Sequence, residues 1–93
     1  MGIEPLVLLI NNEKEIMQLN RFFTKKNIKW SSGHNFLDIY SISYLCNKEI
    51  EITYYVSPSK IRFNSYSNLE KVFSVKDFLK EKIYEQRIFE YFL

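Results

Sequence analysis

A single histidine lies close to serine side chains, a combination from which nucleophilic hydrolases build their sites. His34 follows Ser31, Ser32 and Gly33 in a stretch typical of a turn. A serine nucleophile needs a base that a third group orients, and the sequence places no such group beside His34. A small hydrolase that uses His34 therefore ranks last among the function classes that we consider. We expect a protein that is not an enzyme and has no catalytic residues.

Metal ligands and reactive thiols are equally sparse. Cys46 is the one cysteine, so it forms no internal disulfide and no cysteine-only zinc site. Glu49 and Glu51 stand two residues apart on one face of an expected strand, but a hard cation needs further oxygen ligands. We interpret them as the solvent face of an amphipathic strand. The two aspartates, Asp38 and Asp77, fall in separate elements, and we expect neither a metal nor a cofactor.

The most basic stretch of the chain, Lys25 to Trp30, supports an alternative function. Basic side chains and an aromatic ring together can hold a nucleic-acid backbone and stack a base. The candidate nucleic-acid contacts are Lys25, Lys26, Lys29, Lys60 and Arg62. The competing interpretation is a positively charged helix end next to a core tryptophan. The net charge of only +2 favours that interpretation, because strong polyanion binders are usually markedly basic.

The first half of the chain predicts a buried strand followed by a helix. The continuous apolar run from Leu6 to Ile10 is typical of a strand that is buried on both faces. Asn12 with Glu15 three positions later forms a capping box, which predicts a helix from about Glu13 to Lys26. Asn27 suits the left-handed conformation that ends many helices.

Three further strands are predicted as an antiparallel meander. Residues 36–45 alternate in polarity, residues 49–56 alternate more strictly, and Ile61 and Phe63 point inward between polar neighbours. Residues 71–73 are a candidate for one short additional strand. Trp30 is expected to fix the end of the first helix on the sheet, and Gly33 to allow the sharp turn into the meander.

A long C-terminal helix is predicted to begin after Ser74, which forms a second capping box with Asp77, and to continue to Leu93. At about 100° per residue, the helix has one apolar sector that suits the core. That sector contains Val75, Phe78, Leu79, Ile83, Phe89 and Leu93. A second group of apolar side chains lies outside it, comprising Tyr84, Ile88, Tyr91 and Phe92. These four, with Tyr55 on the outer face of the sheet as a weaker candidate, are the expected partner-binding residues.

These elements together predict one α+β domain over residues 1–93. Its antiparallel sheet has three to five strands, with an N-terminal helix and a long C-terminal helix packed on it. The chain contains no alanine, and five residue types with AT-rich codons supply 44 of its 93 residues, which fits an AT-rich bacterium, phage or large virus. No apolar run is long enough to span a bilayer, and no secretory leader is visible, so we expect an intracellular protein with no membrane partner.

The segment Asn27-Ile28-Lys29-Trp30-Ser31-Ser32-Gly33, with Val75-Lys76-Asp77-Phe78-Leu79 opening the last helix, resembles a loose group of small phage and prophage proteins. Asn27 stands where many members have glycine, and the tail beyond Lys80 is longer than in the group. The resemblance implies an α+β fold and a phage origin. It carries no shared catalytic residue.

The sequence therefore predicts a non-enzymatic binding protein made by a phage or mobile element. It would act in the host cytoplasm by occupying the surface of a host protein, for example a CRISPR effector or another defence protein. The same C-terminal helix could instead build a homodimer. Nucleic acid is the competing partner.

Overall fold

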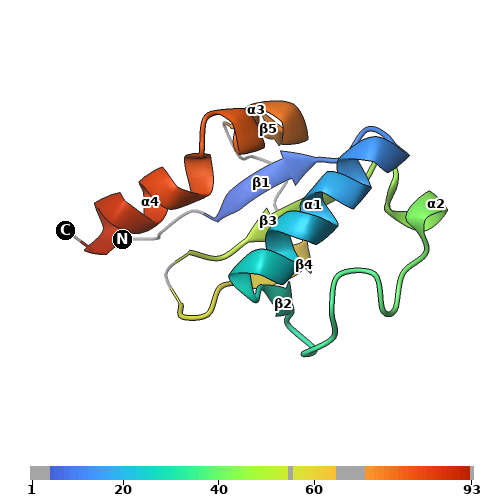
Figure 1. The fold of residues 1–93 in the computed structure, drawn as a ribbon, viewed down its shortest axis with the longest axis horizontal. Helices are drawn as coiled ribbons and strands as arrows, with labels where there is room; N and C mark the ends of the chain where they lie inside the picture. The colour runs from blue at the N-terminus through green and yellow to red at the C-terminus, as the bar shows by residue number, and fades with distance from the viewer. Residues whose placement is uncertain (1–4, 55, 65–70, 93) are drawn as a thin grey trace.

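The computed structural model describes residues 5–54, 56–64 and 71–92, with side chains described as far as residue 90. The chain is an α+β protein whose five-stranded sheet has the order β2-β4-β3-β1-β5 (Figure 1). The strands are β1 (Leu6–Leu9), β2 (Lys29–Trp30), β3 (Glu49–Ile52), β4 (Lys60–Phe63) and β5 (Phe73–Ser74). The helices are α1 (Glu13–Lys26), α2 (Ile42–Leu45), α3 (Val75–Lys80) and α4 (Ile83–Phe92).

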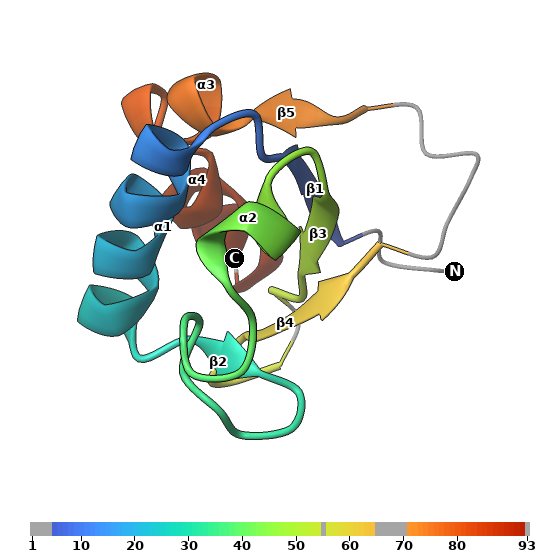
Figure 2. The same cartoon turned by 90° about the vertical axis from the view of Figure 1, so that its right-hand side faces the viewer.

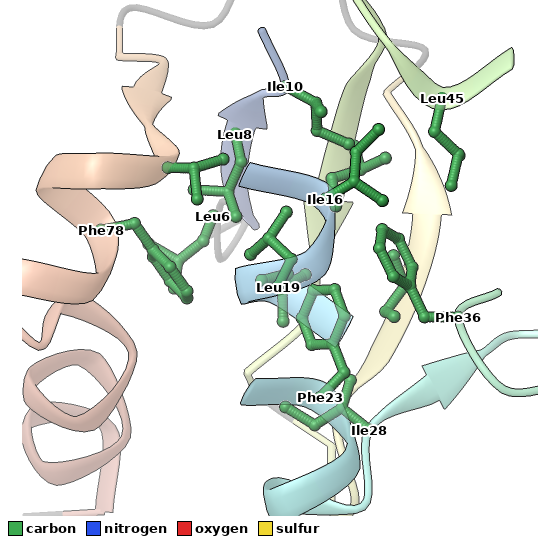
Figure 3. Close-up of a cluster of buried hydrophobic side chains, with 14 of the residues drawn as sticks. Leu6, Leu8, Ile10, Ile16, Leu19, Phe23, Ile28, Phe36, Leu45 and Phe78 are labelled. Carbon is green, nitrogen blue, oxygen red and sulfur yellow. The ribbon is translucent and has the colours of Figure 1, made fainter. Parts of the chain in front are cut away.

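The predicted buried strand is confirmed, and it lies inside the sheet between β3 and β5. Alternate residues of β1 and its extension, Leu6, Leu8 and Ile10, point toward α1 and are almost completely buried (Figure 3). Val7, on the opposite face, is buried as well. Burial of both faces explains why this strand is a continuous apolar run rather than an alternating one.

The first helix follows its sequence signals closely. α1 runs from Glu13 to Lys26, and the Asn12 side chain accepts a hydrogen bond of 2.9 Å from the Glu15 N–H. The Glu15 carboxylate in turn accepts from the Asn11 N–H. Asn27 ends the helix in the left-handed conformation, with φ 58°. Cap residues satisfy backbone groups within a few residues of themselves, so these bounds could be read from the sequence alone.

The sheet is mixed, and the expectation of a purely antiparallel sheet is wrong. β1 pairs with β3, and β3 with β4, in antiparallel register, but β2 runs parallel to β4 and β5 runs parallel to β1. The direction of β2 has a physical origin in its connection to β1. A helix that packs across a sheet returns the chain to its starting end, so the strand after α1 runs in the direction of β1.

The predicted strand over residues 36–45 is also wrong. This segment forms a turn and the single-turn helix α2, and β2 takes the position beside β4 instead. Its polar side chains bond locally: Asp38 accepts from the Asn35 N–H, and Ser41 caps α2 by accepting from the Tyr44 N–H. Such local bonds compete with a strand ladder, whereas Phe36 and Leu45 still reach the core.

The prediction of one long C-terminal helix is wrong, because this part of the chain forms two shorter helices. α3 ends at Lys80, and Lys82 adopts a left-handed backbone with φ 51° before α4 begins. In a continuous helix, Phe78 and Ile83 would point about 140° apart. The break buries both side chains in the same core. It also turns Phe89, which the sequence assigned to the inward sector, out to solvent, where 66% of it is exposed.

The break at Lys82 yields a testable prediction. A β-branched residue is strained at positive φ, so Lys82→Val should lower the free energy of unfolding by about 1 kcal/mol. Lys82→Gly is the matched control, because glycine adopts this conformation without strain and should leave stability equal or slightly higher. Urea denaturation of the three proteins measures both changes. Equal stability of the valine and glycine variants would contradict a constrained left-handed turn.

The helices α1, α3 and α4 pack beside one another. Phe22 of α1 contacts Phe78 and Tyr84 edge to face, at ring distances of 5.2 and 5.7 Å, and α1 and α3 lie on the same side of the sheet (Figure 2). Within the described ranges, no helix is both long enough and apolar enough to span a bilayer.

Candidate interaction surface

An open hollow lies where β2 and β4 meet the turn that precedes α2. It has a volume of about 290 Å³, and rings from Trp30, Tyr40 and Phe63 form much of its lining. Trp30 is firmly fixed, since its indole N–H donates a 2.9 Å hydrogen bond to the Phe36 carbonyl and only 4% of the residue is exposed. The full lining consists of Trp30, Ser31, Ser32, Ile39, Tyr40, Ile61, Arg62 and Phe63.

A row of aromatic rings in mutual contact extends this hollow toward α2. Tyr40 contacts Trp30 at 5.0 Å, and Tyr44 stacks on Tyr40 at 5.4 Å with an angle of 13° between the rings. The Lys48 ammonium lies 4.8 Å from the centre of the Tyr44 ring. Tyr44 is half exposed, and Ile39 is 43% exposed. The rings therefore support one another while their outer edge meets solvent.

A second hollow of about 220 Å³ adjoins the first one, because both are lined by Ser31 and Arg62. Thr53, Val56 and Lys60 complete its lining. We call the two shared residues, Ser31 and Arg62, the ridge between the hollows, and we call the hollows with this ridge the edge groove. Ser31 is fixed to β4, because its N–H donates to the Ile61 carbonyl at 3.0 Å. None of the described residues that line it is acidic.

Arg62 on this ridge is paired with a carboxylate from the sheet interior. Its Nη2 lies 2.8 Å from Oε1 of Glu51, the residue opposite it on β3. Only 1% of Glu51 is exposed, and its Oε2 has no hydrogen-bond partner. The expectation that Glu51 faces solvent is therefore wrong, although Glu49, which accepts a bond from Asn64, is exposed as predicted. The buried carboxylate holds Arg62 in place while half of the arginine side chain remains exposed.

The structure brings together only part of the predicted nucleic-acid site. Lys29 and Lys60 are direct partners across β2 and β4, and Arg62 follows on the same face of β4. Lys26 instead forms an ion pair of 3.3 Å with Glu85 of α4, and Lys25 is exposed at the end of α1. The burial of Trp30 confirms the interpretation of a core tryptophan and removes it as a ring on which a base could stack.

The predicted partner-binding residues of α4 contribute partly to the fold itself. Tyr84 is half-buried, and its hydroxyl lies 2.8 Å from the Ser59 hydroxyl. Ile88 is half-buried against the core, whereas Phe89 is the most exposed large apolar residue among those described. Tyr55 and the side chains of Tyr91 and Phe92 lie outside the described residues, so these three stay predictions.

The groups considered for catalysis are exposed or scattered. Ser32 Oγ lies 3.0 Å from Nδ1 of His34, but both side chains are exposed in the turn that contains Gly33. Cys46 is half-buried at the end of α2 and packs against the core. In the part of the chain that the structure describes, no three acidic, histidine or cysteine side chains gather as a metal site would require.

The sequence pattern did not indicate that Ile39, Tyr44 and Val56 lie at the surface, because alternation in polarity placed all three in predicted strands. Instead, Tyr44 lies in α2, and Ile39 lies in the turn before it, and both are exposed. One signal was present: Ser41 stands three residues before Tyr44, the spacing at which a serine caps a helix, and here its hydroxyl does accept from the Tyr44 N–H at 3.1 Å.

No model of a known protein family matches the chain, and no curated protein or solved structure matches it either. The fold places the chain in the α+β class with a mixed sheet.

Proposed function

We propose that this protein is a non-catalytic binding protein that acts by occupying the surface of another protein. The observation that carries the proposal is the clustering of exposed apolar side chains around the edge groove. Ile39, Tyr44 and Val56 border it, and they are three of the six large apolar residues that the described chain leaves exposed. Exposed apolar surface of this kind, with an arginine and aromatic rings at its centre, is typical of protein-binding sites.

A narrower version of the proposal concerns origin and target. The chain would be encoded by a phage or mobile element and would bind a host protein in the host cytoplasm, such as a CRISPR effector or another defence protein. The AT-rich residue usage, the small size and the Asn27–Gly33 segment support this version. No cofactor and no metal are part of the proposal.

The outer face of α4 is the second surface to be tested. Phe89 is exposed there beside the half-buried Ile88, and the expected contacts Tyr91 and Phe92 follow in the same helix. This face would serve either a foreign protein or a second copy of the chain. Light scattering over a concentration series separates the two cases, because only a homodimer gains mass as the concentration of this protein alone rises.

Nucleic acid remains the alternative partner, supported by the neighbouring side chains of Lys29 and Lys60. The structure gives two reasons to rank it second. Lys26 is paired with the carboxylate of Glu85, and Trp30 is buried. Neutralised cations release fewer counterions and bind phosphates more weakly.

The proposal is tested by capturing partners from cells of the native host with tagged protein and three single variants. Ile39→Lys places a charge at the edge groove, and Phe89→Lys places one on α4. Met17→Lys on α1 is the matched control, because Met17 and Ile39 are similarly exposed, at 39% and 43%. We expect one specific protein that the control retains and Ile39→Lys loses. Loss only with Phe89→Lys would transfer the function to α4, and no specific protein with any variant would refute the proposal.

A further inference from the structure

We propose that the edge groove binds an extended peptide segment of the partner in which one acidic side chain stands between two apolar ones. The inference rests on the proposed function and specifies the chemistry of the partner. In an extended segment, side chains two residues apart point to the same side. The expected pattern is therefore apolar, any residue, acidic, any residue, apolar. The acidic side chain would meet Arg62, and each apolar side chain would enter one of the two hollows.

Charge complementarity supports an acidic side chain at the centre. Arg62 lies on the ridge between the hollows, Lys60 lines the second hollow, and Lys29 is the cross-strand partner of Lys60. Against these three cations, the same face of β3 carries two carboxylates: Glu51, which is buried and engaged with Arg62, and the exposed Glu49, which accepts a bond from Asn64. Asp38, the acidic neighbour of Ile39, lines neither hollow and accepts a bond from the Asn35 N–H. A carboxylate brought to the ridge therefore meets net positive charge.

Arg62 is also preorganised for this contact. Its Nη2 is held by Glu51 at a distance of 2.8 Å, while about half of the side chain remains exposed to solvent. The same side chain lines both hollows. Because a guanidinium carries five N–H donors, the single contact to Glu51 Oε1 leaves donors for a second carboxylate. An arginine that is already held in position loses little side-chain entropy when it binds.

The two hollows suit apolar side chains better than bases. The first hollow is lined by Ile39 and by rings that pack against one another, and the second contains Val56. Tyr44 stacks on Tyr40 and has the Lys48 ammonium over its ring, so its contacts are already made within the protein. A single-stranded nucleic acid needs open ring faces on which to stack. An aliphatic or aromatic side chain of a peptide needs only the apolar hollow.

The test is a selection of random displayed peptides on the immobilised protein, followed by fluorescence anisotropy with the enriched peptide. We expect the enriched sequences to share the apolar–acidic–apolar pattern at alternate positions. Replacing the acidic residue of the peptide by its amide should weaken binding about tenfold, since a charge-assisted contact to Arg62 is lost. This substitution is made in the ligand, so the fold of the protein is not disturbed.

Variants of the protein locate the binding site. Ile39→Lys and Val56→Lys change exposed residues of the two hollows and should each weaken the peptide by about tenfold or more. Met17→Lys should leave the affinity within roughly twofold, because Met17 lines neither hollow. Peptides without an acidic residue, or peptides insensitive to both groove variants, would overturn the inference.

Two further outcomes separate the inference from the proposed function. Labelled single-stranded oligonucleotides that bind in place of any peptide, lose affinity with added salt and are weakened by Lys60→Ala would assign the groove to nucleic acid. If no peptide binds while a captured host protein is lost only with Phe89→Lys, the groove inference fails and the binding function stands on α4. If neither a peptide nor a captured protein is found, both fail.

Discussion

Replacing Trp30 by alanine is expected to lower the free energy of unfolding by about 4 kcal/mol, the largest effect that we expect from a single substitution in this chain. The side chain fills the junction of β2, β4 and the turn before α2, with rings of Phe36, Tyr40 and Phe63 at 5.7, 5.0 and 5.0 Å from its own. Its removal leaves a large cavity and also deletes the 2.9 Å hydrogen bond to the Phe36 carbonyl. Domains of this size are stable by only about 5–15 kcal/mol, so the variant should unfold at a much lower urea concentration.

Trp30→Phe is the control that separates the ring from its N–H group. It keeps most of the apolar volume but not the bond to Phe36, and should cost about 1–2 kcal/mol. The midpoint of urea unfolding, followed by circular dichroism, orders the three proteins. An unchanged midpoint in Trp30→Ala would show that the junction does not depend on this residue, and the lining of the edge groove would lose its structural basis.

The parts of the fold that the sequence predicted correctly are those whose signals act over a few residues. The bounds of α1 depend on Asn12, Glu15 and Asn27, each of which bonds or turns the backbone locally. The buried strand at Leu6 and the start of α3 at Ser74 have the same character. Hydrophobic periodicity and helix caps act between residues that are near each other in the sequence. A single sequence is therefore enough to identify the elements that they determine.

The mixed sheet could not be predicted because strand partners are chosen over long distances. The position beside β4 is taken by the two residues of β2, and not by the ten-residue alternating segment 36–45. Alternation of polarity fits a strand, but it also fits a turn and a short helix whose polar groups bond among themselves. The Ser41 cap and the Asn35–Asp38 turn decide the outcome here.

One backbone conformation determined which C-terminal side chains are exposed. A helix break is usually marked by glycine or proline, but here the residue is a lysine. The left-handed backbone of Lys82 nevertheless divides the expected helix and rotates its second half. Tyr84 consequently bonds to Ser59, and Phe89 faces solvent. A helical wheel drawn through an unrecognised break does not relate the faces of the two helices: Ile83 is buried as the wheel placed it, but Phe89 is exposed. The predicted α4 surface therefore has to be tested through Phe89 as well.

Glu51 illustrates a different limit of sequence patterns. Alternation along β3 correctly groups Glu51 with Glu49 and Thr53 on one face. It does not say whether that face is covered, and Glu51 and Thr53 are in fact buried. A charged residue in a sheet interior is tolerated when it is paired, which the sequence could suggest only if the register of β3 and β4 were known.

Arg62→Ala is expected to lower the free energy of unfolding by about 2–3 kcal/mol, because it leaves the buried Glu51 carboxylate without its ion-pair partner. The expected loss is below that for a fully buried pair, since half of Arg62 is exposed and the attraction is screened by water. Lys60→Ala is the matched control. It removes a cation from the same face of β4, for which the described residues show no ion pair, and should change stability by about 0.5 kcal/mol or less.

The double variant Glu51→Gln with Arg62→Ala tests whether buried charge is the cause. Glutamine keeps the size of the side chain but not its charge, so it should recover most of the stability lost in Arg62→Ala. Glu51→Gln alone should cost less than Arg62→Ala, because the glutamine oxygen can still accept a hydrogen bond from the guanidinium. The four proteins form a thermodynamic cycle in urea that yields the coupling energy of the pair directly. A double variant as unstable as Arg62→Ala would mean that Arg62 acts through the packing of its aliphatic stem. Its role as a preorganised cation on the edge groove would then lack support.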